Sequence, residues 1–92
     1  MQYKELAATG TTTIKTGPGY LQGITVNNPG TGPGTIQIFD QVSAAAPAIA
    51  GATAFALPTA GGFLDYDCHF SNGLTIVIGG TFTNGTVTVE FY

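Results

Sequence analysis

The residues most able to do chemistry in this chain lie together in the segment FLDYDCHF, residues 63–70. Asp65, Asp67 and His69 recur there at every second position, and on a β-strand such positions share one face. Side chains two positions apart on a strand are roughly 7 Å from each other, so the three could in principle share a Ca²⁺ or Zn²⁺ ion. Such a site would need further ligands from other loops or from another subunit.

Those further ligands are scarce in the sequence. Outside this segment and the N-terminus, the only carboxylate side chains belong to Asp40 and Glu90. Alternation of charged and apolar residues is also typical of a half-buried strand with one face in solvent. We therefore assign no metal ligand and no cofactor, and we expect Asp65, Asp67 and His69 to line a solvent-facing strand surface. The sequence leaves open whether these three residues bind an ion.

Catalysis by a nucleophile or an acid–base pair is not supported by these residues. His69 is the only histidine, and no defined nucleophile accompanies it. Cys68, the only cysteine, is expected on the strand face opposite His69, where it would be a small core residue. A single cysteine also excludes a disulfide within the chain. We therefore expect no catalytic residues and a protein that is not an enzyme.

The charge content narrows the classes of partner. Only 8% of the 92 residues are charged, against about 25% in a typical domain, and the net charge is −3 with two lysines and no arginine. Phosphate contacts need several cations, so we expect no nucleic-acid partner and no attachment to an acidic membrane. Because free surfaces normally carry more charge, we expect a partner to cover part of this one.

Three segments could be mistaken for functional motifs. Residues 28–34, NPGTGPG, resemble a phosphate loop, but no helix follows and the prolines remove amide donors. Residues 84–86 match a glycosylation acceptor, yet no apolar leader precedes them, so a tight turn is the better interpretation. The apolar stretch 42–57 is too short to span a membrane and contains Pro47 and Gly51.

Short runs of β-branched residues between turn signals predict strands. Strands are expected over residues 11–15, 20–27, 35–42, 53–57, 63–70, 74–78 and 86–92, and Asn-Gly pairs at 72–73 and 84–85 predict hairpin turns. In residues 20–27, period two places Tyr20, Ile24 and Val26 on one face and Leu21, Gly23 and Thr25 on the other. Six aromatic residues either pack in the core, which is the commoner outcome, or form a sugar-binding platform: Phe63, Tyr66, Phe70, Phe82, Phe91 and Tyr92.

These elements predict an all-β fold, either a small antiparallel β-sandwich or a jelly-roll-like barrel of six to eight short strands. We expect residues 11–92 to form a single β domain. Residues 1–10 lack strand alternation and precede the first clear turn, so we expect an N-terminal arm that orders on a partner or on a neighbouring subunit.

Several runs of the chain resemble small tailed-phage virion proteins of the capsid cement, or decoration, type. The resemblance covers most of the chain from Lys15 onward and is carried by KTGPGYLQGITV (15–26), TIQIFD (35–40), LDYD (64–67), FSNGL (70–74) and VTV (87–89). These runs are turn and strand signals, and the position in the virion stays open.

The resemblance implies a non-enzymatic protein that stabilises a phage head by bridging major capsid protein subunits. It implies a homotrimer on the capsid surface of the virion, made in the host cytoplasm. The sequence leaves two other functions open. One is a structural component of the head–tail junction, neck or tail, and the other is a small carbohydrate-binding or host-adhesion module.

Overall fold

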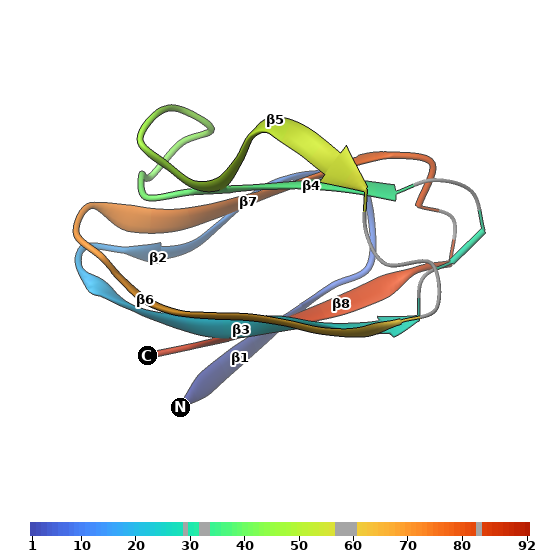
Figure 1. Ribbon diagram of the computed structural model, residues 1–92, viewed down its shortest axis with the longest axis horizontal. Helices are drawn as coiled ribbons and strands as arrows, with labels where there is room; N and C mark the ends of the chain where they lie inside the picture. The colour runs from blue at the N-terminus through green and yellow to red at the C-terminus, as the bar shows by residue number, and fades with distance from the viewer. Residues whose placement is uncertain (29, 32–33, 57–60, 83) are drawn as a thin grey trace.

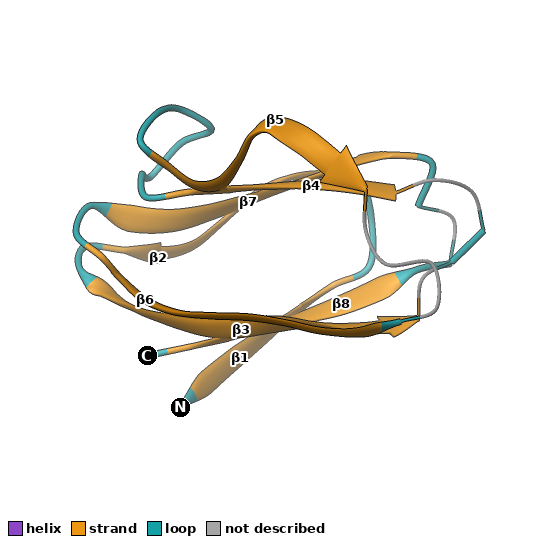
Figure 2. Ribbon diagram, in the orientation of Figure 1, coloured by secondary structure: helices purple, strands orange, loops and turns teal. Residues whose placement is uncertain are grey.

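The computed structural model describes residues 1–28, 30–31, 34–56, 61–82 and 84–92 of the chain. Within these ranges the chain forms strands and turns and no helix (Figure 2). The strands are β1 (Gln2–Leu6), β2 (Gly10–Thr16), β3 (Gly19–Asn28), β4 (Gly34–Phe39), β5 (Ala48–Ala56), β6 (Gly62–Phe70), β7 (Gly73–Gly80) and β8 (Thr86–Phe91). Accordingly, the described residues contain no helix with the length and apolarity that a membrane crossing requires.

The strands pair into two antiparallel sheets that pack face to face (Figure 1). Their strand orders are β1-β8-β3-β6 and β2-β7-β4-β5. Every pair of consecutive strands except β4 and β5 is divided between the two sheets, which is the connectivity of a double-sheet jelly roll. The predicted all-β class and the small sandwich architecture are therefore confirmed.

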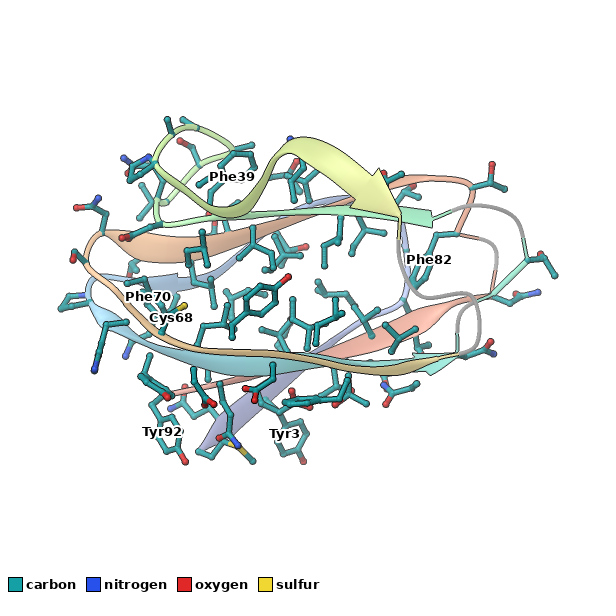
Figure 3. The ribbon with its side chains drawn as sticks, viewed as in Figure 1. Tyr3, Phe39, Cys68, Phe70, Phe82 and Tyr92 are labelled. Atoms are coloured by element: carbon teal, nitrogen blue, oxygen red, sulfur yellow. The ribbon has the colours of Figure 1, made fainter. Side chains whose placement is uncertain are left out.

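Alternating apolar side chains from both sheets fill the space between the layers. β7 contributes Leu74, Ile76 and Ile78 to this core, and β8 contributes Val87, Val89 and Phe91, at every second position of each strand. Phe70 and Phe82 are also buried in the core, and Cys68 packs against it from a half-buried position (Figure 3).

A bulge in β3 overturns the predicted assignment of its faces. Leu21, Ile24 and Val26 are the buried hydrophobic residues of this strand, whereas Tyr20 is only half-buried. The pairing of β3 with both β6 and β8 shifts register at Gln22, so the side-chain alternation changes phase there. Simple period-two counting fails across such a residue, because the bulge adds one position to one strand only.

The N-terminal segment, expected as an arm, is built into a sheet. Residues 2–6 form β1, which pairs antiparallel with β8 from Gln2 opposite Phe91 to Leu6 opposite Val87. Leu6 is buried in the core, while the other four residues of β1 are exposed. The exposed residues of β1 lie on both of its faces, so its sequence shows no apolar alternation. Backbone pairing with β8 and one buried apolar side chain, that of Leu6, hold this edge strand in place.

The segment after β4 folds back over the outer side of the second sheet. β4 ends at Phe39, earlier than the predicted 35–42 strand, and the Asp40 amide donates to the Pro47 carbonyl at 2.8 Å. The hydroxyl of Thr75 donates to the Gln41 carbonyl at 2.7 Å, so the segment lies against β7. Phe39 is buried beneath it, outside the main core (Figure 3).

The alanine-rich part of the chain enters the sheet earlier than predicted. β5 begins at Ala48 rather than near residue 53 and pairs with β4. Residue 57, the last position of the predicted strand, lies outside the described residues. In the predicted turns, Asn84 has a positive φ of 59°, and residues 71–72 join β6 to β7.

Candidate functional site

The outer face of the β1-β8-β3-β6 sheet gathers most of the polar chemistry of the chain. Strand register places Tyr3, Glu90, Gly23 and Asp65 in one row across the four strands. The next row contains Glu5, Thr88, Thr25 and Phe63. We call the surface formed by these two rows the outer face.

Exposed aromatic side chains stand on and beside the outer face. Tyr3 is 75% exposed and Phe63 is 50% exposed, and Tyr92, just past the end of β8, is 51% exposed. Figure 3 shows Tyr3 and Tyr92 pointing away from the core. Of the predicted core aromatics, Phe63 and Tyr92 are therefore exposed, whereas Tyr66, Phe70, Phe82 and Phe91 pack in or against the core.

The Phe63 ring packs against the backbone at Gly23. A Cβ atom built on Gly23 would collide with the ring of Phe63 and would lie 2.6 Å from the Leu64 carbonyl oxygen. Part of the ring therefore lies over the backbone of β3 at Gly23, the one residue of the Tyr3–Asp65 row that lacks a side chain. This contact keeps an apolar ring on the solvent side of the sheet.

The carboxylates of the chain concentrate on the same side. Glu5, Asp65 and Glu90 belong to the two rows, and Asp67 follows on β6, so Asp40 is the only acidic residue located elsewhere. Lys4 is opposite the inward-facing Val89, on the other side of β1. The outer face is therefore acidic and carries no lysine.

Glu90 is the most constrained of these carboxylates. Its Oε1 atom accepts a 2.7 Å hydrogen bond from the Thr25 hydroxyl. Its Oε2 atom is buried and has no hydrogen-bond partner among the described residues. A buried polar atom without a donor is costly in free energy, and a native structure generally retains one only for a reason.

The three residues singled out from the sequence do share one exposed face of β6. Asp65, Asp67 and His69 are exposed, and Tyr66 and Cys68 between them are half-buried, so the predicted alternation is confirmed. Asp67 has a positive φ of 45° at a register shift between β3 and β6. Among the described residues, no three His, Cys, Asp or Glu side chains lie close enough together to hold a metal ion.

Tyr20 of β3 contacts two of these β6 residues, a connection that the sequence did not reveal. Its hydroxyl donates to Asp67 Oδ1 at 3.0 Å, and its ring meets the His69 ring edge-on with 5.0 Å between centroids. The hydrogen bond to Asp67 raises the pKa of Tyr20. A hydrogen bond with Asp67, followed by desolvation and charge repulsion, raises the pKa of Asp65. These groups are mainly engaged with each other.

A shallow depression lies beside this cluster, where β2, β3 and β6 meet the C-terminal residue. It has a volume of about 500 Å³ and is open to solvent. Lys15, Tyr20, His69, Ser71 and Tyr92 contribute to its lining. The Lys15 ammonium donates to the Tyr92 carbonyl at 3.1 Å. The depression therefore combines aromatic edges with several hydrogen-bonding groups.

The remaining chemical groups have structural roles. Asp40 accepts hydrogen bonds from the backbone amides of Ser71 at 2.9 Å and Asn72 at 2.8 Å, which fixes the β6–β7 turn. Burial acts to raise the pKa of Asp40, but the amide donors outweigh it and the pKa is lowered. Burial raises the pKa of the Cys68 thiol, so Cys68 is not an activated nucleophile.

Sequence reasoning missed the contribution of β1 to the outer face. Tyr3 and Glu5 alternate with Gln2 and Lys4, but all four are polar or amphipathic, so no apolar period indicated a strand. Glu90 lies between Val89 and Phe91, which are buried in the core, so the alternation of β8 places it on the outer face. No protein-family model, curated protein or solved structure matches the chain.

Proposed function

We propose that this protein is a non-enzymatic capsid decoration protein of a tailed phage, which stabilises the head by bridging major capsid protein subunits. The single observation that carries the proposal is the outer face, a sheet surface with exposed aromatic rings on a charge-poor jelly roll. Exposed apolar groups that gather on one face are typical of a protein–protein contact.

The two sides of the sandwich differ in a way that supports this use. The segment after β4 covers part of the β2-β7-β4-β5 sheet, burying Phe39 and Thr75. The described residues place no comparable loop over the outer face of the other sheet, and Tyr3 and Phe63 remain exposed there. The outer face is therefore the natural candidate for contact with another protein.

The fold supports the same class by analogy only. Double-sheet jelly rolls occur in viral capsid proteins, and also in lectin domains and cupins. Fold likeness alone does not establish function. It agrees with the resemblance of the sequence to small virion proteins, which implies a homotrimer on the capsid surface, made in the host cytoplasm before assembly.

Cosedimentation with tailed-phage heads that lack the protein tests the proposal. We expect saturable binding and a higher temperature for head disruption after binding. Light scattering on the free protein should give three times the mass of one chain if it acts as a trimer. Failure to sediment with heads at any ionic strength would reject the decoration role.

A carbohydrate-binding or host-adhesion role is the second candidate, and the depression beside Tyr20 favours it. Tyr92 and His69 offer ring edges, and Lys15 and Ser71 offer hydrogen-bonding groups, which is the mixture that polar ligand sites use. Glycan-array binding that is lost in Tyr92→Ala would support this role. Absence of binding to any glycan would remove it.

A further inference from the structure

The outer face has a charge that this chain cannot neutralise by itself. It carries Glu5, Asp65 and Glu90 in the two rows, with Asp67 next to them. The whole chain contains two lysines and no arginine. Lys4 is on the other side of β1, and the Lys15 ammonium already donates to the Tyr92 carbonyl. A second copy therefore offers few cations, so self-association does not satisfy this face.

The sign of the charge also narrows the class of partner. Nucleic acids and acidic membranes carry negative charge and would be repelled by these carboxylates. A divalent ion is disfavoured because the described residues hold no cluster of three ligating side chains. A protein surface that carries positive side chains remains, and interfaces generally match potentials of opposite sign.

The aromatic rings and Glu90 distinguish arginine from lysine. A guanidinium group can donate to a carboxylate and stack on an aromatic ring at the same time, whereas an ammonium group is a compact charge. The Tyr3 ring is in register with Glu90, and Phe63 is on β6 two residues from Asp65. The buried Oε2 atom of Glu90 has no donor in the described part of the chain, and a guanidinium group would supply one.

We propose that the outer face of the β1-β8-β3-β6 sheet docks on an arginine-bearing protein surface, with guanidinium groups pairing with Glu90, Asp65 and Glu5 between the rings of Tyr3 and Phe63. This inference rests on the proposed function, because it states the chemistry of the capsid surface that the protein would contact. Because the Oε2 atom of Glu90 is buried in the free chain, side chains beside it must move for a donor to reach it.

Titration of the full ¹⁵N-labelled chain with a hexa-arginine peptide tests the inference. We expect saturable shift changes in the amides of Tyr3, Glu5, Asp65 and Glu90, and binding about threefold tighter than that of hexalysine. The triple variant E5Q/D65N/E90Q should bind about tenfold more weakly, and affinity should fall as salt rises. Asp40→Asn is the matched control, because it removes one carboxylate from outside the face and should leave the affinity unchanged.

Three results would overturn the inference. They are an absence of saturable binding, shift changes centred on Asp40 or on the depression beside His69, and equal loss of affinity in D40N and the triple variant.

Binding to phage heads distinguishes this inference from the decoration role. Heads that bind the triple variant as well as the wild type would leave decoration intact and reject the arginine contact. Hexa-arginine binding without head binding would support the arginine contact and reject the decoration role.

Discussion

At the residue scale, the two aspartates Asp40 and Asp65 show how local donors and neighbours give carboxyl groups opposite pKa shifts. Backbone amides of the β6–β7 turn donate to Asp40, and its pKa is lowered. Asp65 instead interacts with Asp67, and its pKa is raised. The sequence could not distinguish these environments, because the donors to Asp40 lie more than 30 positions away along the chain.

Replacing Asp40 with asparagine should destabilise the protein at neutral pH. The change removes charge-assisted hydrogen bonds at a solvent-exposed turn, so we expect a loss of about 1 kcal/mol in the free energy of unfolding. Because the folded pKa lies below the ordinary 3.8, this stabilisation is complete above 3.8 and is lost as the pH falls through the folded value. Urea unfolding from neutral pH to about pH 2 measures it.

Asp65→Asn is the matched control for this prediction. A raised folded pKa means that Asp65 favours folding at low pH and that this contribution is lost as the pH rises. The variant should therefore be no less stable than the wild type at neutral pH. A difference between wild type and D40N that grows at low pH would contradict the role given to Asp40.

Cys68 should react slowly while the protein is folded. Its thiol is half-buried and burial raises its pKa, so little reactive thiolate is present. We expect alkylation at neutral pH to be at least about tenfold slower in buffer than in denaturant. The only cysteine of the chain gives a single signal by mass spectrometry, and equal rates in the two conditions would show that the thiol is exposed.

At the element scale, assigning side chains to strand faces by period two worked in regular strands and failed at a β-bulge and in an edge strand. In the regular strands β7 and β8, the apolar residues at every second position lie in the core. In β3 the register shift at Gln22 changes the phase of the side chains. The adjacent Gly23 is the sequence signal of such a bulge, and period-two counting does not take it into account. β1 escaped prediction because an edge strand held mainly by its backbone needs no apolar stripe.

Gly23→Ala should be destabilising through overpacking. The added methyl group meets the Phe63 ring and the Leu64 carbonyl, so we expect a loss of about 1–3 kcal/mol in the free energy of unfolding. Thr11→Ala, at an exposed position in β2, should change stability by no more than about 0.5 kcal/mol. Chemical denaturation of the two variants would measure this, and equal stability would show that β3 relaxes around the methyl group.

Substitutions at Leu6 and Tyr3 should distinguish the residue that anchors β1 in the core from the residue that β1 presents to solvent. Leu6 is buried in the core, so Leu6→Ala should cost about 2 kcal/mol and increase amide hydrogen exchange along β1. Tyr3→Ala removes a 75% exposed ring and should change stability by no more than about 0.5 kcal/mol. Rapid exchange or proteolysis of residues 2–6 in the wild type would instead favour the free arm expected from the sequence.

At the scale of the whole molecule, the sequence predicted the fold class better than the site. Dense turn signals and β-branched runs were sufficient for an all-β sandwich, because each strand predicted from the sequence had an apolar face to bury. The outer face depends on the strand order, which brings β1 and β8 beside β3 and β6. Alternation within single segments carries no information about such pairing, so Tyr3, Glu90 and Asp65 could not be grouped in advance.

The orientation of the protein on a phage head tests the proposed function most directly. Electron cryomicroscopy of decorated heads should resolve jelly-roll density with the β1-β8-β3-β6 sheet turned toward the shell and Tyr3 and Phe63 in contact with it. The Tyr3→Ala/Phe63→Ala variant should leave these positions largely empty at the same protein concentration. Heads without added density, or with the β2-β7-β4-β5 sheet against the shell, would contradict the proposal.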